Sequence, residues 1–124
     1  MNIRYLGKES NVKNSPSLYA TDQDSYIVQG WRHADLSTLN RLTIPDDETI
    51  VEVPPALFNH LAGDSFSGTI TVLCAPIMSV TQDGNYIVQG KRVTDAAVLA
   101  KMNIPAHETC VEVKTSDLLA LFGS

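Results

Sequence analysis

The sequence predicts an α+β fold in which short, mostly antiparallel strands alternate with short helices in one compact domain, residues 1–124. Three observations predict this class. The chain repeats itself with a period of sixty residues, and each copy opens with a hairpin signal. The composition, 44% hydrophobic and 19% charged, is that of an ordinary globular protein. We expect two pseudo-symmetric repeats, residues 1–63 and 64–124.

The repeat is strongest between residues 26–53 and 86–113, which align without a gap and are identical at fifteen of 28 positions. Both segments begin with YIVQG and end with VEV. Two copies are too few for a solenoid, which generally needs three or more repeats. Two facing halves, related like the subunits of a fused C2 dimer, fit the pattern better.

A β-hairpin is expected at the start of each copy. Residues 17–21 and 25–30 are rich in β-branched and aromatic residues and flank the turn residues DQD. Residues 77–81 and 86–90 flank the turn residues QDGN in the same way. Both hairpins should pair antiparallel.

Further strands are predicted around the hairpins. The alternating segments 48–53 and 108–113 predict one strand in each copy. Residues 2–7 and 68–73 predict one more in each. The polar run 7–17 in the first copy is typical of a surface loop.

Four short helices are expected. Asp35 and Asp95 suit the N-cap position, and the closing helices have Gly63 and Gly123 where a helix commonly ends. Thr115 or Ser116 suits the cap of the last one. The four segments with apolar spacing of three or four residues are 36–42, 96–102, 54–63 and 115–124.

Charge and hydropathy exclude several classes of protein. The net charge is −5 with a sequence pI near 4.9, and the nine Lys and Arg residues are scattered, which disfavours direct nucleic-acid binding. No apolar run is long enough to span a membrane and the first residues lack a signal-peptide pattern, so we expect a cytoplasmic protein.

Cys74 and Cys110 lie in apolar, strand-like runs, where a cysteine usually behaves as a small buried hydrophobe.

A polar and cationic motif recurs in the two copies. Gln29 and Arg32 in the first are matched by Gln89 and Arg92 in the second, and together they could clamp an anionic ligand or a partner's carboxylate.

The structural alternative gives these residues local roles. Gly30 would end the strand in a turn with positive φ, and the arginines would bond Glu52, Glu112 or a neighbouring carbonyl. Conservation of the motif in both copies favours this alternative.

Positions where the copies differ point to function more directly. Trp31 stands where the second copy has Lys91, next to Arg32 and His33. An exposed Trp there would be a good anchor for a protein partner, whereas a buried one would serve packing. The last helix is apolar almost all round, which predicts that it is clasped in the core or forms a dimer contact.

No catalytic, metal or cofactor motif is recognisable. His33, His60 and His107 have no zinc spacing, and no Gly-rich phosphate loop occurs. Glu52 and Glu112 are more simply explained as solvent-facing strand residues than as a catalytic pair. We therefore expect no cofactor and no metal, and we lean against an enzyme.

The segments TCVEV at 109–113 and VEVPPALFNHLAG at 51–63 resemble the small acidic actinobacterial BldB-like regulatory family. The resemblance implies a non-enzymatic regulatory protein that works with a helix-turn-helix DNA-binding partner, and it brings no catalytic residues. Unlike the family pattern, CVEV here leads directly to a predicted helix.

The sequence thus predicts first a non-enzymatic protein-interaction or regulatory module with a protein partner and a possible homodimer. A second hypothesis is a small-molecule binding protein or enzyme with an anionic-ligand site between the repeats. A third is an acidic inhibitor of a nucleic-acid-binding protein.

Overall fold

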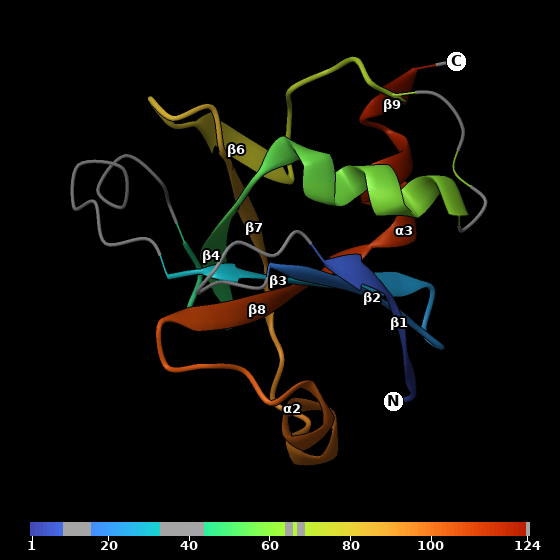
Figure 1. Cartoon of the computed structure of the whole chain (residues 1–124), viewed down its shortest axis with the longest axis vertical. Helices are drawn as coiled ribbons and strands as arrows, with labels where there is room; N and C mark the ends of the chain where they lie inside the picture. Colours follow the sequence, from blue (N-terminus) through green and yellow to red (C-terminus); the bar gives the residue numbers. More distant parts are fainter. Residues whose placement is uncertain (9–15, 33–43, 64–65, 67–68, 124) are drawn as a thin grey trace.

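The computed structural model describes residues 1–8, 16–32, 44–63, 66 and 69–123. The strands are β1 (Ile3–Lys8), β2 (Ser17–Thr21), β3 (Ser25–Trp31), β4 (Glu48–Val53), β5 (Thr69–Ile70), β6 (Ile77–Val80), β7 (Tyr86–Arg92), β8 (Glu108–Lys114) and β9 (Phe122–Gly123). The helices are a 3₁₀ helix, η1 (Pro55–Gly63), and two α-helices, α2 (Ala96–Met102) and α3 (Thr115–Leu119). Figure 1 shows their arrangement. The protein has the predicted α+β fold, with seven antiparallel strands in one sheet.

Four strands pair in a closed cycle. β3 pairs with β8 along its whole length, and β4 pairs with β7 along its whole length. The cycle closes at two short contacts, Trp31 opposite Glu52 between β3 and β4, and Lys91 opposite Glu112 between β7 and β8. The main partner of each strand therefore comes from the other predicted repeat.

Both predicted hairpins are present. β2 pairs with β3 and β6 pairs with β7, all antiparallel. The strand predicted from residues 2–7 is present as β1, and it pairs with the outer edge of β2. β6 has no described strand on its outer edge.

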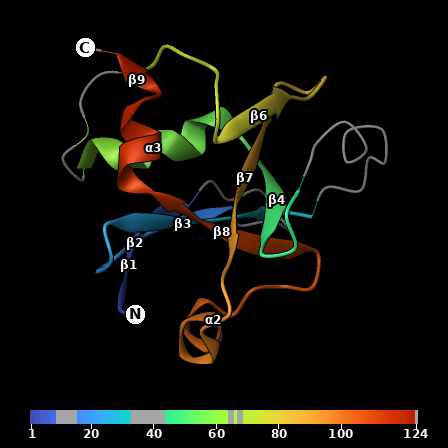
Figure 2. The same ribbon diagram turned by 180° about the vertical axis from the view of Figure 1, so that it is seen from behind.

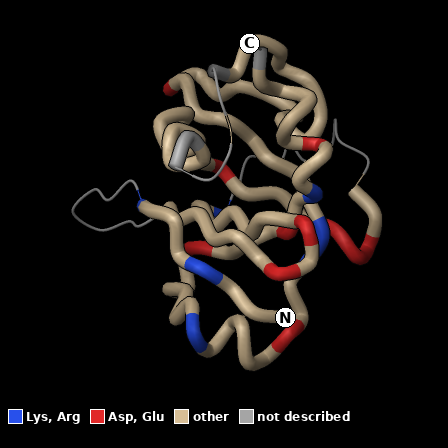
Figure 3. The backbone as a smooth tube through the Cα atoms, turned by 90° about the vertical axis from the view of Figure 1, so that its right-hand side faces the viewer, with Lys and Arg blue, Asp and Glu red and all other residues tan. Residues whose placement is uncertain are grey.

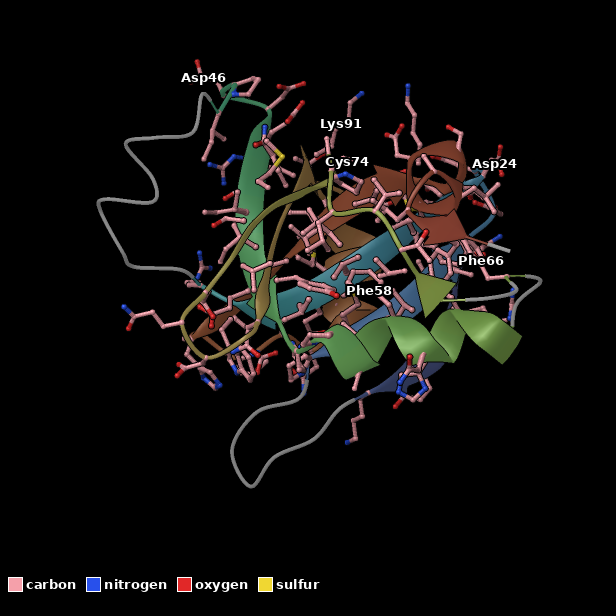
Figure 4. All side chains as sticks on the ribbon, turned by 90° about the horizontal axis from the view of Figure 1, so that it is seen from above. Asp24, Asp46, Phe58, Phe66, Cys74 and Lys91 are labelled. Carbon is pink, nitrogen blue, oxygen red and sulfur yellow. The ribbon has the colours of Figure 1, made fainter. Side chains whose placement is uncertain are left out.

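Apolar residues fill both faces of this sheet. The main core lies between the strands, η1 and α3, and includes Val28, Val53 and Phe58; Figure 4 shows Phe58 beside the strands that η1 covers. A smaller cluster of Ile27, Cys110 and α2 residues occupies the opposite face. Accordingly α2 lies on the other side of β3 and β8 from η1 and α3 (Figures 1 and 2).

The helix α2 begins as the sequence predicts. The Asp95 side chain accepts hydrogen bonds from the backbone N–H groups of Ala97 and Val98, at 3.0 and 3.3 Å. Those bonds satisfy two of the free donors of the first turn, and they lower the pKa of Asp95, the one to Val98 most. The equivalent helix expected over 36–42, with its Asp35 cap, lies outside the described residues.

Gly30 and Gly90 do not have the role proposed from the sequence. Both lie inside strands, and the described glycine with positive φ is Gly84, at 84° in the β6–β7 turn. A Cβ on Gly30 would lie 2.6 Å from the carbonyl oxygen of Glu52. A Cβ on Gly90 would lie equally close to the carbonyl oxygen of Glu112. Glycine is required because another strand crosses close at the two points where the sheet closes.

The end of the chain differs from the predicted helix 115–124. Lys114, not Thr115 or Ser116, is the N-cap residue, and α3 ends at Leu119. Gly123 lies in β9 instead of ending a helix. Phe122 pairs with Ile70 and its ring packs 5.1 Å from that of Phe66, so tertiary pairing overrides helix propensity here.

The strand predicted over 68–73 is shorter than expected. It stops at Ile70 because β9 offers just two residues, and the N–H groups of Thr71 and Val72 bond the Leu121 carbonyl instead. The chain then runs along the surface, which leaves Leu73 exposed. Cys74, predicted to be buried, is also exposed, whereas Cys110 is buried as predicted. Both are free thiols.

Within the described part of the chain, no helix is both long and apolar enough to cross a bilayer.

Candidate functional site

The glutamines of the repeated motif form two matching side-chain pairs. Gln29 donates from Nε2 to Oε1 of Glu108, and Gln89 donates from Nε2 to Oε1 of Glu48, each at 2.7 Å. In both pairs the glutamine Oε1 is buried without a hydrogen-bond partner. The glutamines therefore link the two predicted repeats, and each uses one of its two amide N–H donors to do so.

The arginines hold the loop that precedes the opposite strand. The backbone N–H of Arg32 donates to the His107 carbonyl and its Nε to the Ala106 carbonyl, both at 3.0 Å. Arg92 repeats this on the first copy, with bonds of 2.8 Å to Asp47 and 3.1 Å to Asp46. The carbonyl alternative from the sequence is correct, and pairing with Glu52 or Glu112 is not.

The structure brings Arg32 and Arg92 to one pocket. The pocket has a volume of about 400 Å³, and Thr49 and Thr109 line it together with the two arginines. These four residues form two pairs sixty positions apart. The remaining lining residues come from β8, α2 and the loops before and after α2: Val93, Thr94, Leu99, Ile104, Pro105, Ala106, Glu108 and Cys110.

The arginine head groups are available to a ligand. Both side chains are exposed, and Nε is the guanidinium nitrogen that bonds another described residue. A guanidinium has five N–H donors, so four remain on each arginine. Bonding through Nε also fixes the direction of each head group, which reduces the entropy lost on binding.

Glu108 is the acidic residue among the pocket's lining, and its side chain is fully buried. Its carboxyl group accepts the Gln29 amide, and Oε2 lies 3.3 Å from Nε2 of His107. The two arginine charges therefore dominate the accessible part of the pocket. Cys110 supplies no nucleophile at neutral pH, because burial raises the pKa of its thiol to about 11.

The copies differ in charge beside this pocket. The loop of the first copy carries Asp46 and Asp47, whereas the second has Ala106 and His107 in their places. Ala106 lines the pocket and Asp46 does not. The pocket thus extends toward the copy that lacks the two loop carboxylates, which favours an anion there.

The glutamines do not join the arginines in this pocket. Gln29 is buried at 3% exposure. Gln89 and Lys91 line another pocket, of about 590 Å³, with Glu48 and Glu112. Trp31 is half-buried, with its indole N–H buried and unbonded among the described residues, and His33 lies outside the described residues.

Sequence reasoning missed the roles of Glu48 and Glu108. It considered Glu52 and Glu112, but Glu52 accepts a bond from Asn85 and Glu112 one from Ser25, at 2.9 and 2.6 Å, and both are half-buried. Conservation of Glu-Thr at the start of both strands was the available signal. Strand register was needed to use it, because it sets Glu108 opposite Trp31 and Glu48 opposite Lys91, each diagonal to a glutamine on the partner strand.

Other features of the described residues add no chemistry. No group of three or more His, Cys, Asp or Glu side chains in that part of the chain could hold a metal ion. Figure 3 shows the Lys and Arg residues spread along the chain and not gathered on one face. Comparison with known protein families, curated proteins and solved structures finds no match for this chain.

Proposed function

We propose that the protein binds a small anionic molecule between its two repeats, at the pocket that Arg32 and Arg92 line. The observation that carries the proposal is that two arginines sixty residues apart line one pocket, each with four N–H donors that bond no other described residue. The volume of about 400 Å³ suits a metabolite-sized ligand.

A thermal-shift screen of the full chain against anionic metabolites and nucleotides tests this. A ligand present at a hundred times its Kd stabilises the fold by about 2.7 kcal/mol, a rise in Tm of roughly 10 °C in a domain of this size. The rise should be lost in Arg32→Ala and kept in Lys101→Ala, which removes a positive charge from an exposed α2 residue outside the pocket. An unchanged rise in Arg32→Ala would refute the site.

A protein-interaction or regulatory role is the second candidate, favoured by exposed apolar side chains. Leu73, Met78 and Val80 are 58%, 39% and 45% exposed on or just before β6, the strand whose outer edge no described strand covers. Exposed apolar residues at a free edge suit a protein partner or a second copy of this chain. Met78→Lys should abolish co-purification with such a partner without changing the circular dichroism spectrum.

Two further proposals concern the origin of the repeats and the cellular compartment of the protein. We infer that the repeats are pseudo-symmetric halves of a fused dimer, since their strand pairings and Gln–Glu bonds recur with a sixty-residue offset. Two free thiols suit a reducing cytoplasm.

A further inference from the structure

Building on the proposed anion site, we propose that its ligand is a small phosphate monoester with an apolar body. The phosphoryl group faces Arg32 and Arg92, and the body lies against the apolar wall of the pocket near α2. Charge, donor count and the lining of the pocket support this.

The charge of the site matches a dianion. The two exposed arginines place two positive charges on the accessible lining, whereas the side chain of Glu108 is fully buried, accepts the Gln29 amide and lies 3.3 Å from Nε2 of His107. A phosphate monoester carries close to two negative charges at neutral pH.

The number of donors also exceeds what one carboxylate can accept. Four N–H groups on each arginine bond no other described residue, and Thr49 and Thr109, which carry hydroxyl groups, line the same pocket. A carboxylate has two oxygens, whereas a phosphoryl group presents three strong acceptor oxygens in directions that suit two guanidinium forks.

Away from the arginines, part of the pocket lining is apolar. Val93, Leu99 and Ile104 contribute an apolar surface, and all three are half-buried. The volume of about 400 Å³ is larger than inorganic phosphate requires. An apolar substituent on the phosphate therefore has a place to bury its surface.

The remainder of the chain disfavours a polyanion. The net charge is −5, and acidic Asp46 and Asp47 lie beside the backbone N–H and Nε of Arg92. A nucleic acid or a chain of phosphates would extend past the arginines into this acidic surface. A compact ligand with one phosphoryl group avoids it.

Isothermal titration calorimetry of the full chain with four probes tests the proposal. The probes are phenyl phosphate, inorganic phosphate, phthalate and benzoate. We expect phenyl phosphate to bind at least about tenfold more tightly than inorganic phosphate, because the ring buries apolar surface. It should also bind more tightly than phthalate, a dicarboxylate, and far more tightly than benzoate.

Matched variants locate the binding. Arg32→Ala and Arg92→Ala should each weaken phenyl phosphate about 10- to 100-fold, and Lys101→Ala should leave the Kd unchanged. Because the arginines also hold loop carbonyls, a second measurement uses the wild-type chain. Backbone amide resonances of Thr49, Thr109, Arg32 and Arg92 should shift on titration with phenyl phosphate.

The outcomes separate the two proposals. Preference for phthalate or benzoate, with binding still lost in the arginine variants, would overturn the phosphate monoester and keep the anion site. Absence of binding by every probe would overturn the phosphate monoester, while stabilisation of the chain by other anions would still test the site. Binding unchanged in both arginine variants, or shifts confined to other residues, would overturn both.

Discussion

The two copies of the YIVQG motif make the same hydrogen bond in different surroundings. Gln29 in β3 is 3% exposed and its partner Glu108 is 1% exposed, whereas Gln89 and Glu48 are both half-buried. The two hairpins that carry these glutamines also differ at their outer edges. β1 covers the outer edge of the first hairpin, and no described strand covers that of the second.

This comparison separates the features that the two copies share from those in which they differ. Bonds that hold the sheet together are kept in both copies, because each copy completes the other. Burial is decided by what packs outside the repeated segment, and it differs. Substitutions at equivalent positions should therefore remove the same interaction in each copy but lower the free energy of unfolding by different amounts.

Substitution of the two motif glycines should have the largest effect. We expect Gly30→Ala to lower the free energy of unfolding by about 3 kcal/mol and Gly90→Ala by about 2 kcal/mol, measured by urea denaturation. In each case the new Cβ would meet a carbonyl oxygen of a crossing strand at 2.6 Å, and the half-buried Gly90 has more room to adjust.

Gly84→Ala serves as the control, because nothing lies within 4 Å of its added Cβ and the positive φ is the sole source of strain. It should cost about 1 kcal/mol. If Gly30→Ala were no more harmful than Gly84→Ala, the close approach of β3 and β4 would be wrong.

Removal of the glutamine side chains should have the next largest effect. Gln29→Ala leaves the Glu108 carboxyl group buried without its amide donor and should cost about 2 kcal/mol. Gln89→Ala should cost about 1 kcal/mol or less, because water can reach Glu48. Exposed Gln82 provides the control, with an expected change near zero. Equal losses in the free energy of unfolding at Gln29 and Gln89 would show that the difference in burial between the two Gln–Glu pairs has no energetic effect.

The cap of α2 predicts a smaller, pH-dependent effect. Because the folded-state pKa of Asp95 is lowered from 3.8, its stabilisation is present above that value and is lost as the pH falls through the folded-state pKa. Hydrogen exchange of the Ala97 and Val98 amides, corrected for intrinsic rate, should accelerate severalfold in that range. Asp95→Asn should abolish the pH dependence; its persistence would assign the effect to another group.

The thiols should differ in reactivity without affecting stability. One thiol, Cys74, should react with a disulfide reagent in the native protein, and two after denaturation. Cys110 is protected by burial and by a pKa of about 11. Cys74→Ser should leave the native protein unreactive, and residual fast labelling would show that Cys110 is accessible.

Local patterns in the sequence predicted much of the fold. The two hairpins, the strands β4 and β8, and the Asp95 cap follow from alternation, turn residues and capping chemistry. Predictions failed where a distant segment decides the structure. Phe122 becomes a strand residue because Ile70 pairs with it, and Cys74 is exposed because β5 has too short a partner to continue.

The candidate site was likewise predictable where local sequence patterns decide it, and unpredictable where distant segments do. The repeated Gln and Arg residues could be selected from the sequence, and Arg32 and Arg92 do line one pocket. The sequence could not show that the arginines lie apart from the glutamines, because this depends on which strands pair and in which register. The register of β3 and β8 sets Gln29 opposite Cys110 and Glu108 opposite Trp31, and this brings Gln29 diagonally to Glu108, a residue 79 positions away in the sequence.

A crystal structure of the full chain grown with phenyl phosphate tests the proposed site most directly. We expect the phosphoryl oxygens within hydrogen-bonding distance of the guanidinium groups of both Arg32 and Arg92, with the ring against Leu99 and Ile104. A phosphate held by one arginine at the surface, or bound elsewhere on the chain, would contradict the account.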